Sequence, residues 1–159
     1  MSAARPAPDG GIGPALRRAP SDHWVLPVIA LGGIAGAEFR YGVSTVFPHR
    51  PDQVPVGTWL VNVSGCFLIG VLMVVITELR QPHPLMRPFL GVGVLGGYTT
   101  FSTATVEVQV LVIHGHAVPA LGYLLGTVAG ALVATALGTA ATRAARATWV
   151  RHRTGVARP

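Results

Sequence analysis

A polar stretch interrupts the third of four apolar runs in the chain. Residues 96–107 read GGYTTFSTATVE and carry six hydroxyl side chains and one carboxylate. Paired glycines and a run of threonines weaken a helix. Broken backbone at membrane depth frees carbonyls that can bind a cation, and N–H groups or hydroxyls that can bind an anion. The pattern therefore predicts an ion site at a helix break, and periodicity alone does not choose between a cation and an anion.

Four charged or amide side chains, one of them the carboxylate of the polar stretch, are costly inside apolar runs, and such groups are functional candidates when they face protein or water. Glu38 and Arg40 lie two residues apart, so on a helix they point to different faces, and structural roles are favoured for both. The Asn62 amide offers two donors and one acceptor, which suit either interhelical bonding or a pore wall. These residues are Glu38, Arg40, Asn62 and Glu107.

Small residues recur every four positions in the last apolar run and predict close helix packing in lipid. Beside them, Tyr123 and Thr127 form a second column that can hydrogen-bond, although Thr127 can equally bond to its own helix backbone. The small residues are Gly122, Gly126, Gly130, Ala134 and Gly138.

Several other kinds of site are excluded. The motif Gly91-x-Gly93-x-x-Gly96 has the letters of a dinucleotide fingerprint but follows no strand. His114 and His116 lie without carboxylate or cysteine partners, which argues against a metal site. The apolar runs contain no catalytic triad or carboxylate pair, so we expect no enzyme, and the basic residues do not interleave with aromatic ones as nucleic-acid binding requires.

The elements that must position these residues are transmembrane helices. Of the 159 residues, 50% are hydrophobic and 11% charged, far from soluble proteins. Runs of roughly 20 residues, which cross a bilayer, occur at about 24–46, 56–77, 88–113 and 117–140. We expect an all-α protein with a disordered Arg- and Pro-rich tail at 1–22 that is not a signal peptide, a four-helix domain at 23–142 whose third helix is broken, and a basic tail at 143–159.

Arginine distribution predicts the orientation. With four spans, both tails and the middle loop share one side, which carries ten arginines, whereas the opposite side has only Arg50. By the positive-inside rule both termini are cytoplasmic, in a multi-pass protein of the cell membrane in contact with lipid. The ten are Arg5, Arg17, Arg18, Arg80, Arg87, Arg143, Arg146, Arg151, Arg153 and Arg158.

The four apolar runs together resemble the small bacterial fluoride channels called Fluc or CrcB. The resemblance rests on GGIAGAEFRYGVS in the first run, GTWLVNVSGCFLIG in the second, GVGVLGGYTTFSTATVE in the third and the glycine-rich fourth. It implies a dimer of oppositely inserted subunits with two pores, which lets fluoride leave the cell passively and so lowers its toxicity.

The resemblance also assigns roles by position. Gly96 and Thr99 resemble residues whose backbone carbonyls hold a structural sodium ion at the dimer centre. Arg40 resembles the first-span arginine, which with Glu107 we expect at the dimer interface or in a structural role. Donors and a phenylalanine edge suit a small, strongly hydrated anion. The implied fluoride pathway consists of Asn62, Phe101, Ser102, Thr103, Tyr123 and Thr127.

Two departures from the family pattern suggest a heterodimer. Ala104 stands where the family has its second pore phenylalanine, and Ala131 replaces a hydroxyl on the fourth helix. The strong arginine bias favours one orientation, whereas a homodimer needs both. We therefore weigh a homodimer against pairing with an oppositely oriented paralogue. A small four-helix exporter of another substrate and a non-conducting membrane scaffold remain as alternatives.

Overall fold

The computed structural model describes residues 22–78 and 83–154, and this part of the chain is helical. A short 3₁₀ turn, η1 (Asp22–Trp24), leads into α1 (Val25–Val46), and a loop leads to α2 (Val56–Glu78). The third span has three pieces: a π-helix η2 (Arg87–Leu95), a short α3 (Gly96–Tyr98) and α4 (Phe101–Ile113). The last helix is α5 (Ala117–Thr154).

Helices α2 and α5 are each long and apolar enough to cross a membrane, with mean hydropathies of 2.4 and 1.8 in their most apolar windows. The first span has 22 residues. The break at Thr99 and Thr100 divides the third, as the sequence predicts. The four expected helical segments are therefore present, and the first three have bounds close to the predicted ones.

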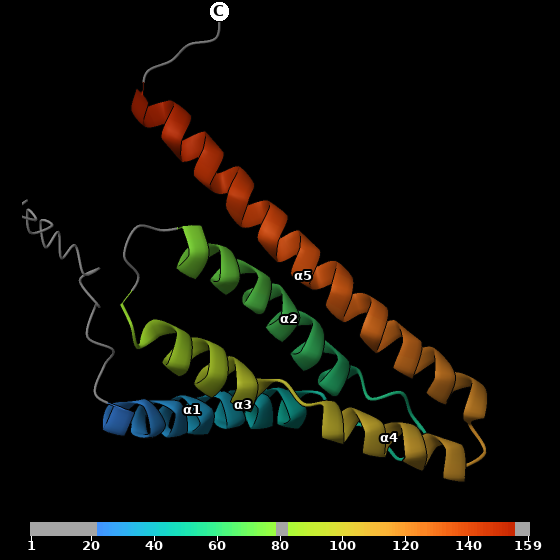
Figure 1. The fold of residues 1–159 in the computed structure, drawn as a ribbon. Helices are drawn as coiled ribbons and strands as arrows, with labels where there is room; N and C mark the ends of the chain where they lie inside the picture. The colour runs from blue at the N-terminus through green and yellow to red at the C-terminus, as the bar shows by residue number, and fades with distance from the viewer. Residues whose placement is uncertain (1–21, 79–82, 155–159) are drawn as a thin grey trace, which may run out of the picture.

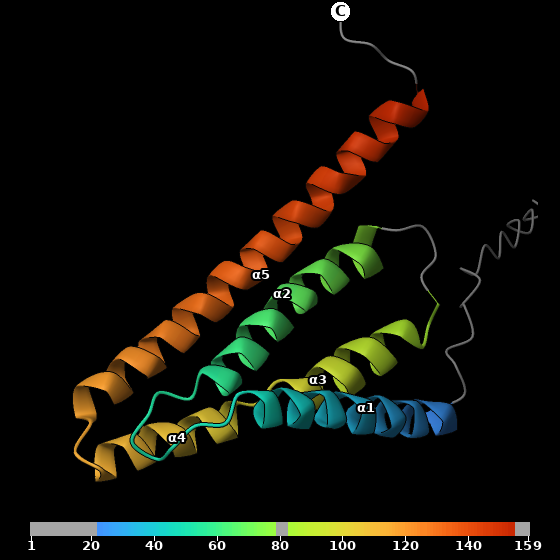
Figure 2. The same ribbon diagram turned by 180° about the vertical axis from the view of Figure 1, so that it is seen from behind.

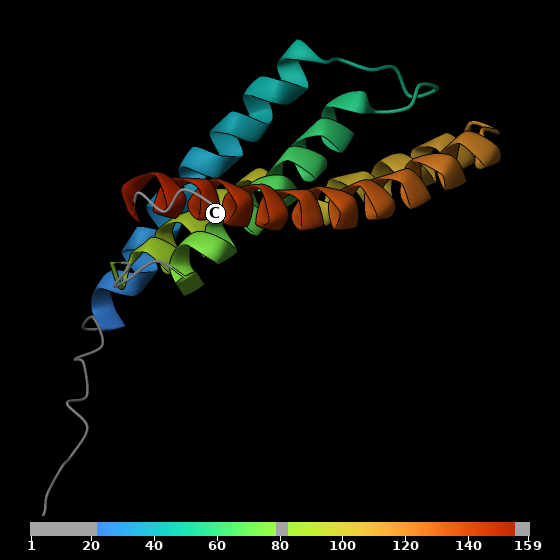
Figure 3. The same cartoon turned by 90° about the horizontal axis from the view of Figure 1, so that it is seen from above.

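Successive spans run in opposite directions. Figure 1 shows the start of α1, the end of α2, the start of η2 and the end of α5 toward the left of the molecule, with the other ends toward the right. Helices α2 and α5 lie side by side in both Figure 1 and the view from behind, where α1 runs along the first half of the third span (Figure 2). Seen from above, α5 crosses over α4 (Figure 3).

Glycines permit the two closest helix contacts. A Cβ on Gly36 of α1 would collide with the Val94 carbonyl, and one on Gly138 of α5 would collide with the Phe67 carbonyl of α2. Helices that approach this closely in lipid gain van der Waals contact, which drives their association there. The predicted small-residue stripe on α5 thus packs against α2 in its second half, whereas a Cβ on Gly122 or Gly126 would meet nothing within 4 Å.

Helix α5 continues to Thr154, well beyond the end of the span predicted near residue 140. Its 38 residues correspond to about 57 Å, compared with about 30 Å of hydrocarbon. Alanines and arginines with high helix propensity explain the continuation. The basic segment after residue 142 therefore begins as helix, while the proposed tail at 1–22 lies almost wholly outside the described residues.

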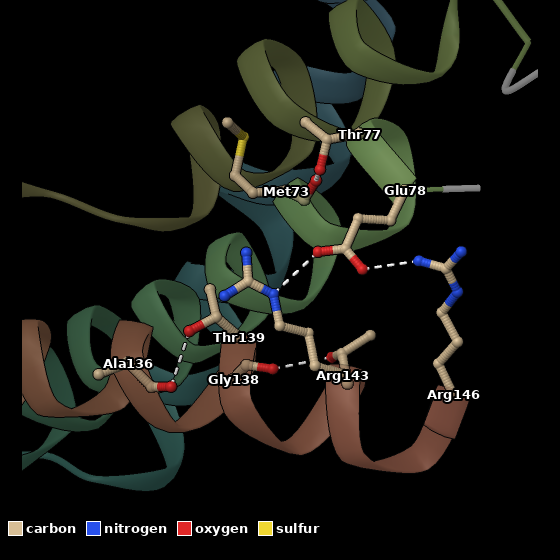
Figure 4. A network of polar contacts seen from close by, with 9 residues as sticks. Met73, Thr77, Glu78, Ala136, Gly138, Thr139, Arg143 and Arg146 are labelled. Atoms are coloured by element: carbon tan, nitrogen blue, oxygen red, sulfur yellow. Dashed lines mark hydrogen bonds and ion pairs between the residues drawn. The ribbon is translucent and has the colours of Figure 1, made fainter. Parts of the chain in front are cut away.

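An ion-pair cluster fastens this extension to the end of α2 (Figure 4). The Arg143 Nε donates to Glu78 Oε1 at 2.8 Å, and Arg146 Nη1 donates to Glu78 Oε2 at 2.7 Å. One carboxylate therefore holds two arginines that are three positions apart on α5.

Candidate functional site

Asn62 holds the break in the third span. Its Nδ2 donates to the Thr100 carbonyl at 2.9 Å, and its Oδ1 accepts from the Thr100 N–H at 2.8 Å. Both residues are buried, with exposures of 7% and 8%. Because the paired bonds satisfy a backbone unit that has left the helix, they remove the cost of an unpaired polar group at membrane depth.

Thr100 then starts the second half of the span. Its backbone is extended, and its side chain accepts a hydrogen bond from the Thr103 N–H at 3.1 Å, the geometry of a helix N-cap. The Thr100 hydroxyl also donates to Thr103 Oγ1 at 2.9 Å. The amino end of α4, with its partial positive charge, therefore begins at the break.

A chamber of about 290 Å³ lies between α2, α4 and α5 beside the break. Four of the six residues predicted for a fluoride pathway line it: Asn62, Phe101, Tyr123 and Thr127. Ala104, which is 4% exposed, lines it as well. The hydroxyl of Thr127 donates to the Tyr123 carbonyl at 2.7 Å, so it bonds to its own helix, one of the two alternatives that the sequence left open.

The other two predicted pathway residues lie away from this chamber. Ser102 and Thr103 are exposed, and Thr103 lines a second cavity of about 250 Å³ between α1, α2 and α4. Arg40 also lines the second cavity, and its Nη1 donates to the Thr99 carbonyl at 3.3 Å. Thr100 borders both cavities, so the N-cap of α4 is the element that they share.

Glu107 joins three helices below the chamber. Its Oε1 accepts from the Thr58 hydroxyl of α2 at 2.6 Å, and its Oε2 accepts from the Tyr123 hydroxyl of α5 at 2.8 Å. The His49 imidazole, in the loop between α1 and α2, lies 3.7 Å away. Within one subunit, Glu107 therefore links α4 to α2 and α5 through its two hydroxyl partners, and its predicted place at the dimer interface or in a structural role stays a prediction.

Two backbone carbonyls at the break are the predicted sodium ligands. In an unbroken helix the Thr100 N–H would bond to the Gly96 carbonyl, but here it donates to Asn62 instead. Gly96 is exposed, so this carbonyl loses its helical donor at the subunit surface. Carbonyl oxygens suit a hard cation, whereas the Arg40 guanidinium already occupies one side of the Thr99 oxygen.

Sequence reasoning missed three residues of this site. Thr58 and His49 contact Glu107, and Thr100 pairs with Asn62. Thr100 carried a weak signal because it adjoins Thr99 and Phe101, and Thr58 carried one because it lies about one helical turn before Asn62. His49 carried none, because a loop histidine gives no hint of which helix it will face. Glu38, in contrast, is exposed on α1 and lines an open groove there.

Comparisons with known proteins identify the family. The family model described as CrcB-like protein, Camphor Resistance (CrcB), matches residues 27–139, which include all the spans. The chain is 53% identical over 124 residues to a protein of Nocardia farcinica named fluoride-specific ion channel FluC 2, covering 78% of this chain and 89% of that one.

Two further relatives carry the same kind of name. Fluoride-specific ion channel FluC 1 of Streptomyces coelicolor is 48% identical, with 75% of this chain and 77% of the relative covered. FluC 2 of Thermobifida fusca is 46% identical, with 74% and 87% covered. With its helices, its broken third span and these matches, the chain is a membrane protein that belongs to the CrcB family.

Proposed function

We propose that the chain is a subunit of a fluoride-specific channel that lets fluoride leave the cytoplasm passively. The observation that carries this proposal is the break at Thr100 in the third span. There the Asn62 side chain binds the Thr100 backbone between α3 and α4, and the amino end of α4 lies beside a chamber. The relatives named as fluoride-specific channels support the choice of ion.

The chemistry of the break favours an anion. Fluoride gives up a strong hydration shell only where donors replace it. Helix amino ends supply N–H groups and partial positive charge, and the second Nδ2 hydrogen of Asn62 is available after the first bonds to Thr100. The edge of the Phe101 ring, positive in its quadrupole, adds an apolar wall that an anion can face. Ser102 and Thr103 are exposed, and in the proposed dimer a second subunit would cover them and complete the pathway.

A fluoride-efflux assay tests the channel and separates it from its alternatives. Liposomes loaded with fluoride and holding the chain, alone or with a paralogue, should release fluoride, and Phe101→Ala should reduce the release. Phe101 is 72% exposed in the single subunit, so its replacement leaves the fold intact. Absence of efflux from the parent, alone and with a paralogue, would favour a non-conducting scaffold, and efflux that needs a proton gradient would favour an exporter. Unchanged efflux in Phe101→Ala would reject the role of Phe101 in the pathway.

A structural sodium ion at the dimer centre is part of the proposal. Its ligands would be the Gly96 and Thr99 carbonyls of two subunits, which is supported by the Gly96 carbonyl that Asn62 frees from the helix. The ion would neutralise carbonyl dipoles that meet at the break. Replacing sodium by a large organic cation during reconstitution should weaken dimers and efflux together. Equal dimerisation in both salts would contradict the sodium site.

We further propose that the chain pairs with an oppositely oriented paralogue. Ala104 and Ala131 lack groups that the family pattern supplies, and the arginines predict one orientation with cytoplasmic termini. Two relatives, FluC 2 and FluC 3, come from the same Streptomyces avermitilis, so numbered paralogues exist in one organism. The chain reconstituted alone should conduct poorly, and fast efflux from the lone chain would refute the pairing.

A further inference from the structure

The carboxylate at the end of the proposed pathway has a titratable neighbour. Glu107 is only 12% exposed and accepts two hydroxyl hydrogen bonds, from Thr58 and Tyr123. Tyr123 lines the chamber, so its hydroxyl links the chamber to Glu107. Beyond Glu107, toward the loop between α1 and α2, a cavity of about 150 Å³ is lined by Glu107 and His49 among others. The chamber, the Glu107 carboxylate and the loop between α1 and α2 therefore lie one after another in space.

The His49 imidazole approaches this carboxylate without bonding to it. The distance of 3.7 Å between Nε2 and Oε1 is too long for a hydrogen bond, so the interaction depends on whether the ring is charged. Histidine changes its charge between about pH 5 and 8. The His49 side chain is 35% exposed, which lets it exchange protons with water.

No other charged group of the described residues competes at this position. From α4 the facing group is Glu107 itself, and from α5 it is the Tyr123 hydroxyl, which is already donated to the carboxylate. Within the loop, Arg50 and Asp52 pair with each other at 3.6 Å. The charges that the described residues bring together at this position are therefore the Glu107 carboxylate and, when it is protonated, the His49 imidazole.

We propose that His49 is a positioning residue for fluoride transport that acts through Glu107. In acid, a protonated His49 offsets the negative charge of Glu107 at the end of the pathway beside the loop between α1 and α2. With a neutral imidazole, Glu107 repels an approaching anion. With an imidazolium, the pair is neutral overall and the anion meets no net repulsion. Fluoride flux therefore rises as the solution at this end becomes acidic. The inference rests on the proposed fluoride conduction.

The test uses fluoride efflux from liposomes that hold the conducting dimer, whether formed by the chain alone or with its paralogue. Flux should be about fivefold higher near pH 5.5 than near pH 7.5, the size expected for one unit charge near a partly solvated path. His49→Gln should give low flux at both values. His49→Arg, which keeps a cation, should give high flux at both.

Two variants complete the design. His114→Gln is the matched control, because the His114 ring bonds to the Val110 carbonyl of its own helix and is absent from the cluster. It should keep the pH profile of the parent. A pH ratio that is the same in His49→Gln as in the parent would overturn the role of His49 while leaving fluoride conduction in place. Absence of fluoride flux in every variant and at every pH would overturn both.

Discussion

At the scale of single residues, the Asn62 amide binds the backbone of one residue at the helix break. It bonds to both the N–H and the carbonyl of Thr100, so one side chain satisfies a whole peptide position that the break leaves open. All buried side-chain nitrogen and oxygen atoms of the described residues have a partner. At the break, the buried Thr100 N–H is bonded to Asn62, which removes the cost of leaving that group unpaired at membrane depth.

Asn62→Ala should lower both stability and fluoride efflux. The buried Thr100 N–H would lose its acceptor, which costs about 1–3 kcal/mol of unfolding free energy. Thermal unfolding in detergent and liposome efflux measure the two effects. Thr45→Ala is the control, because its exposed hydroxyl bonds only within α1. Equal unfolding temperatures for Asn62→Ala and the parent would contradict the role of Asn62 in stabilising the helix break.

Ala104 stands where the family pattern has its second pore phenylalanine. Substitutions at this position test how far the missing aromatic ring limits fluoride conduction. Its methyl group faces the chamber together with Phe101. Ala104→Phe should therefore raise efflux from the chain reconstituted alone several-fold, because a second ring edge can face the anion. Ala104→Leu fills a similar volume without a quadrupole and should not. Equal efflux in the two variants would show that volume, and not the aromatic ring, matters at this position.

At the scale of elements, the two long helices are held by different forces along their length. Within the membrane, α2 and α5 approach through Gly138 and are packed backbone to backbone. Beyond the membrane, the ion pairs of Glu78 with Arg143 and Arg146 hold the two helices together, because small apolar contacts contribute little stability there (Figure 4). The proposed ion path depends on the first kind of contact, and the extension on the second.

Glu78→Gln should loosen the extension and leave the membrane part unchanged. Removing the charge breaks two exposed ion pairs, whose contribution is modest and weakened by salt. Hydrogen exchange should become faster around Arg143 and Arg146 and stay the same in the first half of α5. Asp52→Asn, which breaks an exposed pair in the opposite loop, is the control. An unchanged rate of hydrogen exchange at Arg146 would contradict the role of Glu78 in holding the extension of α5.

At the scale of the whole molecule, the proposed pathway lies partly on the exposed surface of the single subunit. Phe101 and the neighbouring hydroxyls of α4 are exposed at the level of the break, where lipid would leave polar groups without partners. A second subunit covers them in the proposed dimer. The strong arginine bias predicts one orientation for this chain, so the proposed dimer requires a partner that inserts in the opposite direction.

Labelling from one side of the membrane tests the orientation. In a Cys66→Ala background, Thr148→Cys on the α5 extension should react with a membrane-impermeant maleimide only after the cells are opened. Asp52→Cys, in the loop between α1 and α2, should react in intact cells. Labelling of both positions in intact cells would indicate dual insertion and would favour a homodimer.

The sequence by itself determined the membrane class, the helices and the position of the break, because apolar run length and glycine and threonine propensities are local properties. It also placed Asn62, Phe101, Tyr123 and Thr127 in one candidate pathway, and the structure brings these four to one chamber. The sequence did not predict that α5 continues to Thr154, because the predicted end of the span followed hydropathy. Hydropathy falls after about residue 140, whereas helix propensity stays high there.

Only the tertiary structure decided which polar groups meet. The pairing of Asn62 with Thr100, the bonds of Thr58 and Tyr123 to Glu107, and the approach of His49 join residues 16 to 58 positions apart. Such contacts depend on the relative rotation and height of packed helices and on the course of one loop. Close glycine contacts set those quantities, and a single sequence does not reveal them.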